Sequence, residues 1–451
     1  MGRDFFKNLP SEITANILSR LPLRIIAISK CVCKPWRNLL GSHDFAKSLL
    51  SKLKTPPALA CLMPARAYDK FGSTCCTVFE VEEDVQIEHE EEHEEEEEDQ
   101  NQNPNVDEEE HEDENEGQFQ NQNQNFHELH YNRLTDFYIP LGKSVPVSMV
   151  GIAANGLFLL YSELGNLDNP LFIWNPLTRQ YIKLCCPKQS MSFNFMLSFG
   201  FGASQISGQY KVVCINRDGS AHHVYTLGTG TWRCVEAGAA SGFGFNLDGR
   251  IVCNGNLHWI VYDSTRPLLI CGFDVETESF SIFSAPPAAV DESLTLELSV
   301  LRDCLSVSYA WNDEIVIWSM KEYQVEASWT IEYRLSTNGF DFDFGTRNRM
   351  ESVYPIKLFK DGDILMLMLP KDINFYNRKR RLIYYSNKTG TIQQLGMIDE
   401  QLGTIGVLGM IAEQHRTIED VVVGNHLTRA MIFTPALLSL ASFGNENVIS
   451  F

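Results

Sequence analysis

The stretch from Glu88 to Asp99 reads EHEEEHEEEEED and contains the spacing His-Glu-x-x-His at His89, Glu90 and His93. On a helix, two histidines four residues apart share one face and can bind one zinc ion. The glutamate between them can act as a general base toward a zinc-bound water, which is the chemistry of a metalloprotease. Such a helix needs an apolar opposite face that packs against the protein, and a third ligand from another element.

The residues around this motif do not provide that support. Every position between the two histidines is glutamate, five more glutamates follow, and no apolar residue occurs between Ile87 and Val106. A helix that is polar all round has nothing to pack against, and blocks of like charge are usually disordered. We therefore interpret the motif as a chance product of an acidic run, and we expect no metal site and no cofactor.

The charge of the chain is concentrated in this segment. The 451 residues have a formal net charge of −21, but 22 acidic residues lie between Glu80 and Glu116, so the chain without them would carry +1. No lysine or arginine occurs between Lys70 and Arg133. Dense negative charge argues against nucleic acid as a partner of this segment. The sequence NQNQN, which starts at Asn121, extends the low-complexity region.

The rest of the composition is typical of an intracellular protein. Twelve cysteines are scattered with no Cys-x-x-Cys pair, so we expect free, mostly buried thiols in a reducing compartment. The start, MGRDFFKNLP, has no apolar run after its charges, which argues against a signal peptide. No stretch approaches the roughly eighteen apolar residues of a membrane span. We expect a location in the nucleus, the cytoplasm or both, with no membrane and no nucleic acid as partner.

The first fifty residues are expected to be helical. In LPSEITANILSRLP, apolar residues recur at steps of four (Leu9, Ile13, Ile17 and Leu21), which places them on one stripe of a helix that ends before Pro22. Further short helices are predicted in LRIIAISK, CVCKPWRNLL and HDFAKSLLSK. Helices this short cannot bury all of their apolar faces against one another. Part of that surface should therefore meet a partner.

After about Leu129 the pattern is all β. A loose strand–turn–strand repeat starts at Leu171, His223, Cys271, Ile315 and Leu382. Spacings of about fifty residues suit one four-stranded blade per copy, and the longer last interval leaves room for an unrecognised copy. A second element, a turn that leads into an apolar strand, recurs in GIAANGLFLLY, VCNGNLHWIVY and LFKDGDILMLML. The alternation favours a β-propeller, with a long pair of β-sandwiches as the alternative architecture.

Two residue types in the β region have a structural interpretation and a functional one. We interpret the tryptophans as packing residues of the blades, because aromatic side chains fill sheet faces; they are Trp174, Trp232, Trp259, Trp311, Trp318 and Trp329. The sequence GFG at 200–202 and at 242–244 opens no nucleotide-binding helix, so we expect tight turns at both places. Substrate-binding residues of a propeller usually lie on loops at one end, and the sequence does not identify them.

Residues 8–40 resemble an F-box. The matching pieces are Leu9-Pro10 with Glu12-Ile13, Ile17-Leu18, Arg20-Leu21-Pro22, Lys30 to Lys34, and Trp36-Arg37. The rest, apart from the acidic segment, is similar to the kelch-like F-box-associated domain of the large plant F-box family. The sequences that carry this similarity are NGLFLLY, WNPLTRQYIKL, FGFGASQISGQYKVV, NGNLHWIVY, FDVETESFSIF and the closing TPALLSL.

The resemblance implies a substrate-recognition subunit of an SCF-type (Skp-cullin-F-box) ubiquitin ligase, with no catalytic activity of its own. In this family the F-box docks on a Skp-family adaptor, and through it on a cullin, while the C-terminal domain recruits a protein for ubiquitination. Some carried-over residues would also belong to the core of the F-box. Carried over by position, the adaptor-binding residues would be Leu9, Pro10, Ile13, Ile17, Leu18, Leu21, Pro22, Val32 and Trp36.

The expected organisation is that of an α+β multidomain protein. It comprises a three-helix F-box over residues 1–50, a linker with the first β strands over 51–79, an acidic disordered insert over 80–128, and a propeller-like F-box-associated domain over 129–451. We expect the insert in a surface hairpin loop, where a long insertion costs little. The family often has Arg-Phe at the positions of Ile28 and Ser29, and this departure leaves two alternatives: Ile28 repacks the second helix, or it weakens docking.

Two other classes of function remain open. A propeller enzyme would need converging acids, histidines or a metal, and the eleven histidines show no such grouping outside the acidic segment. An acidic-tract binding protein, such as a chaperone for basic proteins, would use residues 80–127 as its recognition element.

Overall fold

The structure is a computed structural model that describes somewhat more than half of the chain as helices, strands and their shorter connections. The described residues are 10–21, 29, 32–40, 42, 45, 58–64, 74–81, 131–139, 147–153, 156–162, 171–176, 178–187, 197–216, 222–263, 266–287, 295–311, 314–337, 352–369, 381–395, 429–433 and 438–450. The acidic segment with its His-Glu-x-x-His spacing lies outside them.

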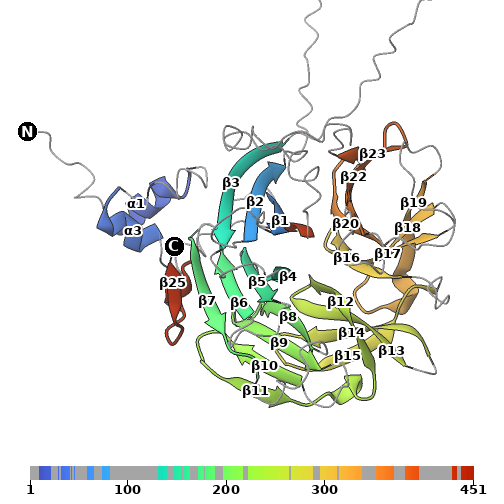
Figure 1. The fold of residues 1–451 in the computed structure, drawn as a ribbon, viewed down its shortest axis with the longest axis horizontal. Coiled ribbons are helices and arrows are strands. Elements are labelled where there is room, and N and C mark those ends of the chain that lie inside the picture. Colours follow the sequence, from blue (N-terminus) through green and yellow to red (C-terminus); the bar gives the residue numbers. More distant parts are fainter. Residues whose placement is uncertain are drawn as a thin grey trace, which may run out of the picture.

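The described strands form six antiparallel sheets that stand in a ring (Figure 1). Five sheets follow the chain order. Their strands are β4 (Val147–Ala153), β5 (Leu157–Ser162), β6 (Leu171–Asn175) and β7 (Gln180–Leu184); β8 (Leu197–Ala203), β9 (Tyr210–Asn216), β10 (His222–Thr226) and β11 (Trp232–Val235); β12 (Gly244–Cys253), β13 (Asn256–Asp263), β14 (Arg266–Asp274) and β15 (Phe280–Ser284); β16 (Glu297–Leu301), β17 (Cys304–Trp311), β18 (Glu314–Met320) and β19 (Trp329–Ser336); β20 (Ser352–Leu358), β21 (Ile364–Leu369), β22 (Arg381–Ser386) and β23 (Thr391–Leu395).

The sixth sheet combines strands from distant parts of the chain. Its order is β24-β1-β2-β3, with β24 at Arg429–Phe433, β1 at Ala58–Pro64, β2 at Thr74–Val81 and β3 at Tyr131–Ile139. Strand β1 pairs with β24 through Leu59 and Ile432. A short final strand, β25 (Val448–Ser450), adds to the outer edge of β7. The pairing of β1 with β24 joins an early and a late segment of the chain in one sheet, which closes the ring.

The first strand of each sheet contacts the first strand of the next. The contacts run from β4 through β8, β12, β16 and β20 to β24, and β24 contacts β4 in turn. A closed ring of six antiparallel sheets is the architecture of a six-bladed β-propeller. A pair of β-sandwiches does not fit this ring, because each sheet packs against two neighbours rather than one partner.

The two repeats seen in the sequence occupy fixed places in the blades. All five copies of the strand–turn–strand repeat are the third and fourth strands of their blades, from β6–β7 to β22–β23. The second element is the turn between the first two strands, where Gly156, Gly255 and Gly362 have φ of 69°, 73° and 95°. Glycine adopts such positive φ values without steric cost.

The expectation of an unrecognised copy between Ile315 and Leu382 was wrong. The described chain passes from β19 directly to β20, and the sixth blade consists of β24 and β1 to β3. Strands β2 and β3 pair as antiparallel neighbours from Thr74 with Ile139 to Val81 with Tyr131, and the acidic segment connects them. The insert therefore joins the strands of a hairpin, as expected. Its length hides the strand–turn–strand pattern in this blade.

The core lies in the layers between neighbouring blades. Phe199 and Phe201 of β8 pack with Ile173 of β6, and Trp259 of β13 packs with Val213 of β9. Five of the six predicted packing tryptophans are buried or packed against these clusters, but Trp311 is 40% exposed at the end of β17. The packing interpretation of Trp311 was therefore wrong.

The first GFG sequence does not form the expected tight turn. Gly200 and Gly202 lie inside β8, which is buried along its whole length. A Cβ atom on Gly200 would lie 2.8 Å from Leu257 Cδ1 and 2.8 Å from Trp259 Cζ2. These glycines therefore allow β13 to approach β8 closely, whereas Gly242, with a φ of 84°, does lie in a turn.

Two helices, α1 (Ser11–Leu18) and α3 (Lys34–Leu40), are described before the propeller. The amide of Thr14 donates to the carbonyl oxygen of Pro10 at 3.0 Å, and the helix ends at Leu18, one turn earlier than the apolar stripe suggested. Residues 22–28 and 30–31 lie outside the described part, so the three-helix arrangement stays a prediction. None of the described helices is long and apolar enough to cross a membrane.

Candidate functional site

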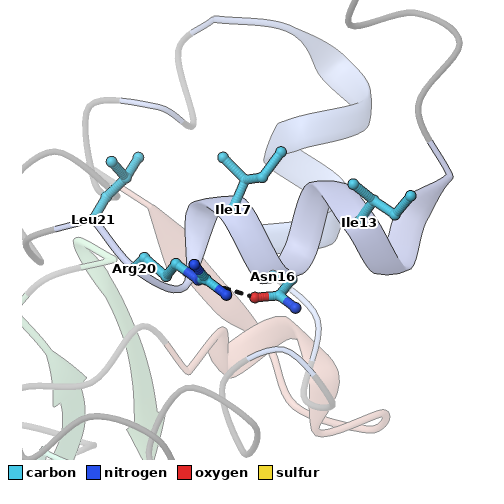
Figure 2. Close-up of a pocket in the computed structure, with 5 residues that line it drawn as sticks. All are labelled: Ile13, Asn16, Ile17, Arg20 and Leu21. Atoms are coloured by element: carbon cyan, nitrogen blue, oxygen red, sulfur yellow. Dashed lines mark hydrogen bonds between the residues drawn. The ribbon is translucent and has the colours of Figure 1, made fainter.

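Helix α1 carries an apolar surface that the described chain leaves uncovered. Ile13 and Ile17, one turn apart, are 48% and 47% exposed, and Val32 before α3 is 64% exposed. Figure 2 shows the side chains of Ile13, Ile17 and Leu21 pointing to the same side of α1. Contact of these apolar side chains with water is unfavourable, so their burial against a partner would stabilise the complex. We call Ile13 and Ile17 the apolar face.

A shallow groove of about 530 Å³ runs beside the isoleucines. It is lined by Ile13, Asn16, Ile17, Arg20 and Leu21. The Nε of Arg20 donates a hydrogen bond to Oδ1 of Asn16 at 3.2 Å, and both side chains lie along the apolar row (Figure 2). Residues four apart on a helix are neighbours, so this pair forms a second row parallel to the first. The groove thus combines an apolar wall with one oriented cation.

A small helical core holds the apolar face in place. Leu18, Leu40 and Phe45 are buried together, and Leu21 and Trp36 pack against them while partly exposed. The hydroxyl of Thr14 donates to the Pro10 carbonyl at 3.2 Å, and that of Ser19 donates to the Asn16 carbonyl at 2.9 Å. These bonds allow two polar side chains to be buried on the inner side of α1. The core fixes which side of the helix faces outward.

The nine predicted adaptor-binding residues do not form one exposed surface. Pro10, Ile13, Ile17 and Val32 are exposed, whereas Leu21 and Trp36 are half-buried. Leu18 is only 1% exposed, so its assignment to the docking surface is corrected: it supports the face from beneath. Leu9 and Pro22 lie outside the described residues.

Sequence reasoning did not include Asn16 and Arg20 in the site. Both line the groove, and their spacing of four residues parallels that of Ile13 and Ile17. A polar pair at positions i and i+4 next to an apolar stripe was visible in the sequence. Its position beside an open groove, however, depends on which side of α1 the core covers.

Two polar clusters of the propeller lie between neighbouring blades. The Nζ of Lys211 donates to the carbonyl oxygen of Val275 at 2.6 Å and pairs with Oε1 of Glu278 at 2.8 Å, which joins β9 to the β14–β15 turn of the next blade. Nε2 of His258 lies 2.8 Å from the hydroxyl oxygen of Tyr323, in the blade that follows. Burial lowers the pKa of His258 to about 4. Both clusters have a structural role at a seam.

The part of the chain that is described contains no group of three or more histidine, cysteine or acidic side chains that could hold a metal ion.

Comparison with protein families matches both parts of the chain. Residues 6–48 match the F-box domain, and residues 127–401, more than half of the chain, match the F-box associated beta propeller domain. The structure extends the propeller beyond the second match. Strands β2 and β25 pair with β3 and β7 inside it, and β1 and β24 complete the sheet of β2 and β3.

Curated relatives come from Arabidopsis thaliana. The F-box protein At3g07870 is 24% identical over 430 residues, which are 86% of this chain and 87% of that protein. The F-box/kelch-repeat protein At3g23880 is 24% identical over 403 residues, which are 84% and 90%. A further F-box protein, At1g46840, is 27% identical over 296 residues, or 63% of this chain, and the chain spans about half (51%) of that protein.

Solved structures add little to this assignment. A polysaccharide lyase of family PL25, an ulvan lyase, aligns over 56% of this chain and 71% of its own with 10% identity and a TM-score of 0.36, which is too low to support an argument. The order of the elements, two short helices followed in the chain by a ring of blades, agrees with the two family matches and with the relatives. The chain belongs to the F-box associated beta propeller family and is a plant F-box protein.

Proposed function

We propose that this protein is the substrate-recognition subunit of an SCF-type ubiquitin ligase. Its F-box docks on a Skp-family adaptor, and through it on a cullin, while the propeller recruits a protein for ubiquitination. The observation that carries the proposal is the apolar face, which lies within the F-box match and is left uncovered by the described part of the chain. An F-box domain implies binding to Skp-family adaptors.

The protein takes no part in bond making under this proposal. F-box proteins are generally non-catalytic receptors. The contribution of this chain would be to hold a substrate lysine near an enzyme charged with ubiquitin, which raises the effective concentration of the two groups. The unit therefore needs two binding surfaces, one for the adaptor and one for the substrate.

The path of the chain supports a separation of these two surfaces. The connection from the F-box enters the propeller at Ala58, which pairs with Glu80 near the end of β2. That end of the blades carries the tight turns between first and second strands. The opposite end carries the connections between second and third strands and those between blades, which are longer on the whole. We assign substrate capture to this opposite end, since binding residues concentrate on such loops.

Two exposed aromatic residues lie at the same end of neighbouring blades. Tyr262, near the end of β13, is 39% exposed, and Trp311, the last residue of β17, is 40% exposed. Aromatic side chains are enriched in protein interfaces. Trp311→Ala should therefore reduce substrate recruitment in affinity purification, while adaptor binding and thermal stability stay unchanged. Equal recruitment by Trp311→Ala and by the unchanged protein would show that Trp311 is not part of the substrate surface.

The adaptor proposal is tested with two isoleucine variants of the full chain. Ile17→Asp places a charge in the apolar face, so binding to a purified Skp-family adaptor should be lost. Ile206→Asp makes the same change at an isoleucine that is 85% exposed in the β8–β9 turn of the propeller, and its binding should equal that of the unchanged protein. Full adaptor binding by Ile17→Asp would refute the proposal.

A further inference from the structure

We propose that Arg20 is a specificity-determining residue of the F-box, which forms an ion pair with a carboxylate of the adaptor next to the apolar contact. This inference rests on the proposed function, because it names the chemistry of the partner at the same site. The apolar face alone would accept many apolar surfaces. A charge of fixed position restricts the choice to a surface with a matching acidic group.

The position of Arg20 is the first observation. Arg20 lies three residues after Ile17 and seven after Ile13, so its side chain flanks the apolar row along the same groove. A partner that buries the two isoleucines must also cover this groove. The guanidinium group would then lie at the border of the contact, where water is partly excluded and a charge pair is stronger than on an open surface.

The hydrogen bonds of Arg20 are the second observation. Within the described part of the chain, the side chain of Arg20 bonds to Oδ1 of Asn16 through Nε, and no carboxylate there pairs with it. A guanidinium group has five N–H donors in a planar fork. The bond at Nε orients the plane and leaves the Nη donors for another acceptor. A carboxylate can accept two such bonds side by side.

The charge of the F-box region is the third observation. Residues 1–50 contain eight lysines and arginines and three acidic residues, which is a net charge of +5 in a chain of −21. A net positive charge on this region favours approach of a negatively charged surface and raises the association rate. The occupant of the groove is therefore an adaptor surface that carries apolar side chains and at least one carboxylate beside them.

Charge variants of the full chain test this inference by adaptor affinity. Arg20→Gln keeps most of the stem but removes the charge, and we expect about tenfold weaker binding; Arg20→Glu should weaken binding further. Arg20→Lys keeps the charge but loses the planar fork, so it should recover part of the affinity lost in Arg20→Gln. Asn16→Ala removes only the orienting bond, so a loss of about two- to threefold is expected. Lys388→Glu, at an exposed lysine of the β22–β23 turn, is the matched control for Arg20→Glu, with the same change in net charge.

The salt dependence distinguishes a charge contact from packing. Between about 0.05 and 0.5 M salt, the difference between the unchanged protein and Arg20→Gln should shrink, because screening weakens the ion pair. If Arg20→Lys loses as much affinity as Arg20→Gln at every salt concentration, the contribution of Arg20 comes from the shape of its side chain and not from its charge, and the charge inference is overturned. If Arg20→Glu binds as well as Lys388→Glu while Ile17→Asp does not bind, this inference fails and the proposed function stands. If Ile17→Asp also binds fully, the proposed function itself fails.

Discussion

The double substitution Ile13→Ala and Ile17→Ala truncates both side chains of the apolar face with little effect on the fold. Each isoleucine is about half exposed, at 48% and 47%. Full burial of such a side chain is worth roughly 1.5–3 kcal/mol, so the part that a partner can still bury is worth about 0.7–1.4 kcal/mol. Alanine keeps one of the four side-chain carbons. The loss is therefore about 0.5–1 kcal/mol per residue.

The two losses together amount to about 1–2 kcal/mol, which corresponds to roughly a 5- to 30-fold increase in the dissociation constant. The assay is titration of immobilised full-length protein with a Skp-family adaptor, beside thermal unfolding of both proteins. The thermal midpoint should stay nearly the same, because exposed side chains contribute little to folding.

A contrasting variant is Leu18→Ala, which truncates a residue that is 1% exposed in the helical core. It should destabilise the F-box by roughly 2–5 kcal/mol and weaken adaptor binding through loss of the folded helices. A double variant that unfolds like Leu18→Ala, or that binds the adaptor as tightly as the unchanged protein, would show that Ile13 and Ile17 do not form a docking face.

Three predictions concern the propeller. Burial, together with neighbouring His223 in the first case, lowers the pKa of His222 and His258 to about 4. Between pH 6.5 and 4 the unfolded chain therefore binds protons that the folded protein does not bind, so the free energy of unfolding should fall as the pH decreases, by roughly 2 kcal/mol per histidine at pH 5. Denaturant titrations of His222→Leu at several pH values should show about half of this loss. An unchanged slope of the free energy of unfolding against pH in this variant would contradict the assignment. Gly200→Ala should cost roughly 1–3 kcal/mol because its Cβ meets the β13 side chains, whereas Gly444→Ala, with no heavy atom within 4 Å, should be neutral in the same titration. Deletion of residues 438–451 removes the buried side chains of Leu438 and Leu440 from the core and breaks the β25–β7 pairing. The free energy of unfolding should fall by roughly 3–6 kcal/mol. A thermal midpoint equal to that of the full chain would show that the segment is dispensable.

The local elements were the most predictable part of this fold. Five strand–turn–strand repeats and three Asn-Gly or Asp-Gly turns were located because a hairpin is encoded by neighbouring residues, namely alternating apolar positions and a glycine that accepts positive φ. The sixth blade could not be located in this way. Its inner strand β24 and its strands β1 to β3 are separated by most of the chain, and pairs such as Leu59 with Ile432 leave no local pattern.

The candidate site was predictable in part for a similar reason. The spacing of four residues identifies Ile13 and Ile17 as neighbours on one side of a helix. The spacing alone does not tell which side of the helix packs against the core. Leu18 was assigned to the surface and is buried against Leu40, whereas Trp311 was assigned to packing and is exposed. Burial depends on what another element places against a side chain.

By itself, the sequence determined the helical start, the blade hairpins, the place of the acidic insert between two strands and the family to which the chain is similar. These features depend on short-range spacing and on residue type. The tertiary structure alone decided that six blades close through the pairing of an early with a late segment of the chain, that Leu18 is the support of the apolar face rather than part of it, and that Arg20 flanks an open groove. The closure depends on contacts between residues far apart in the chain, and the outward side of α1 depends on the packing of Leu40 and Phe45 against Leu18.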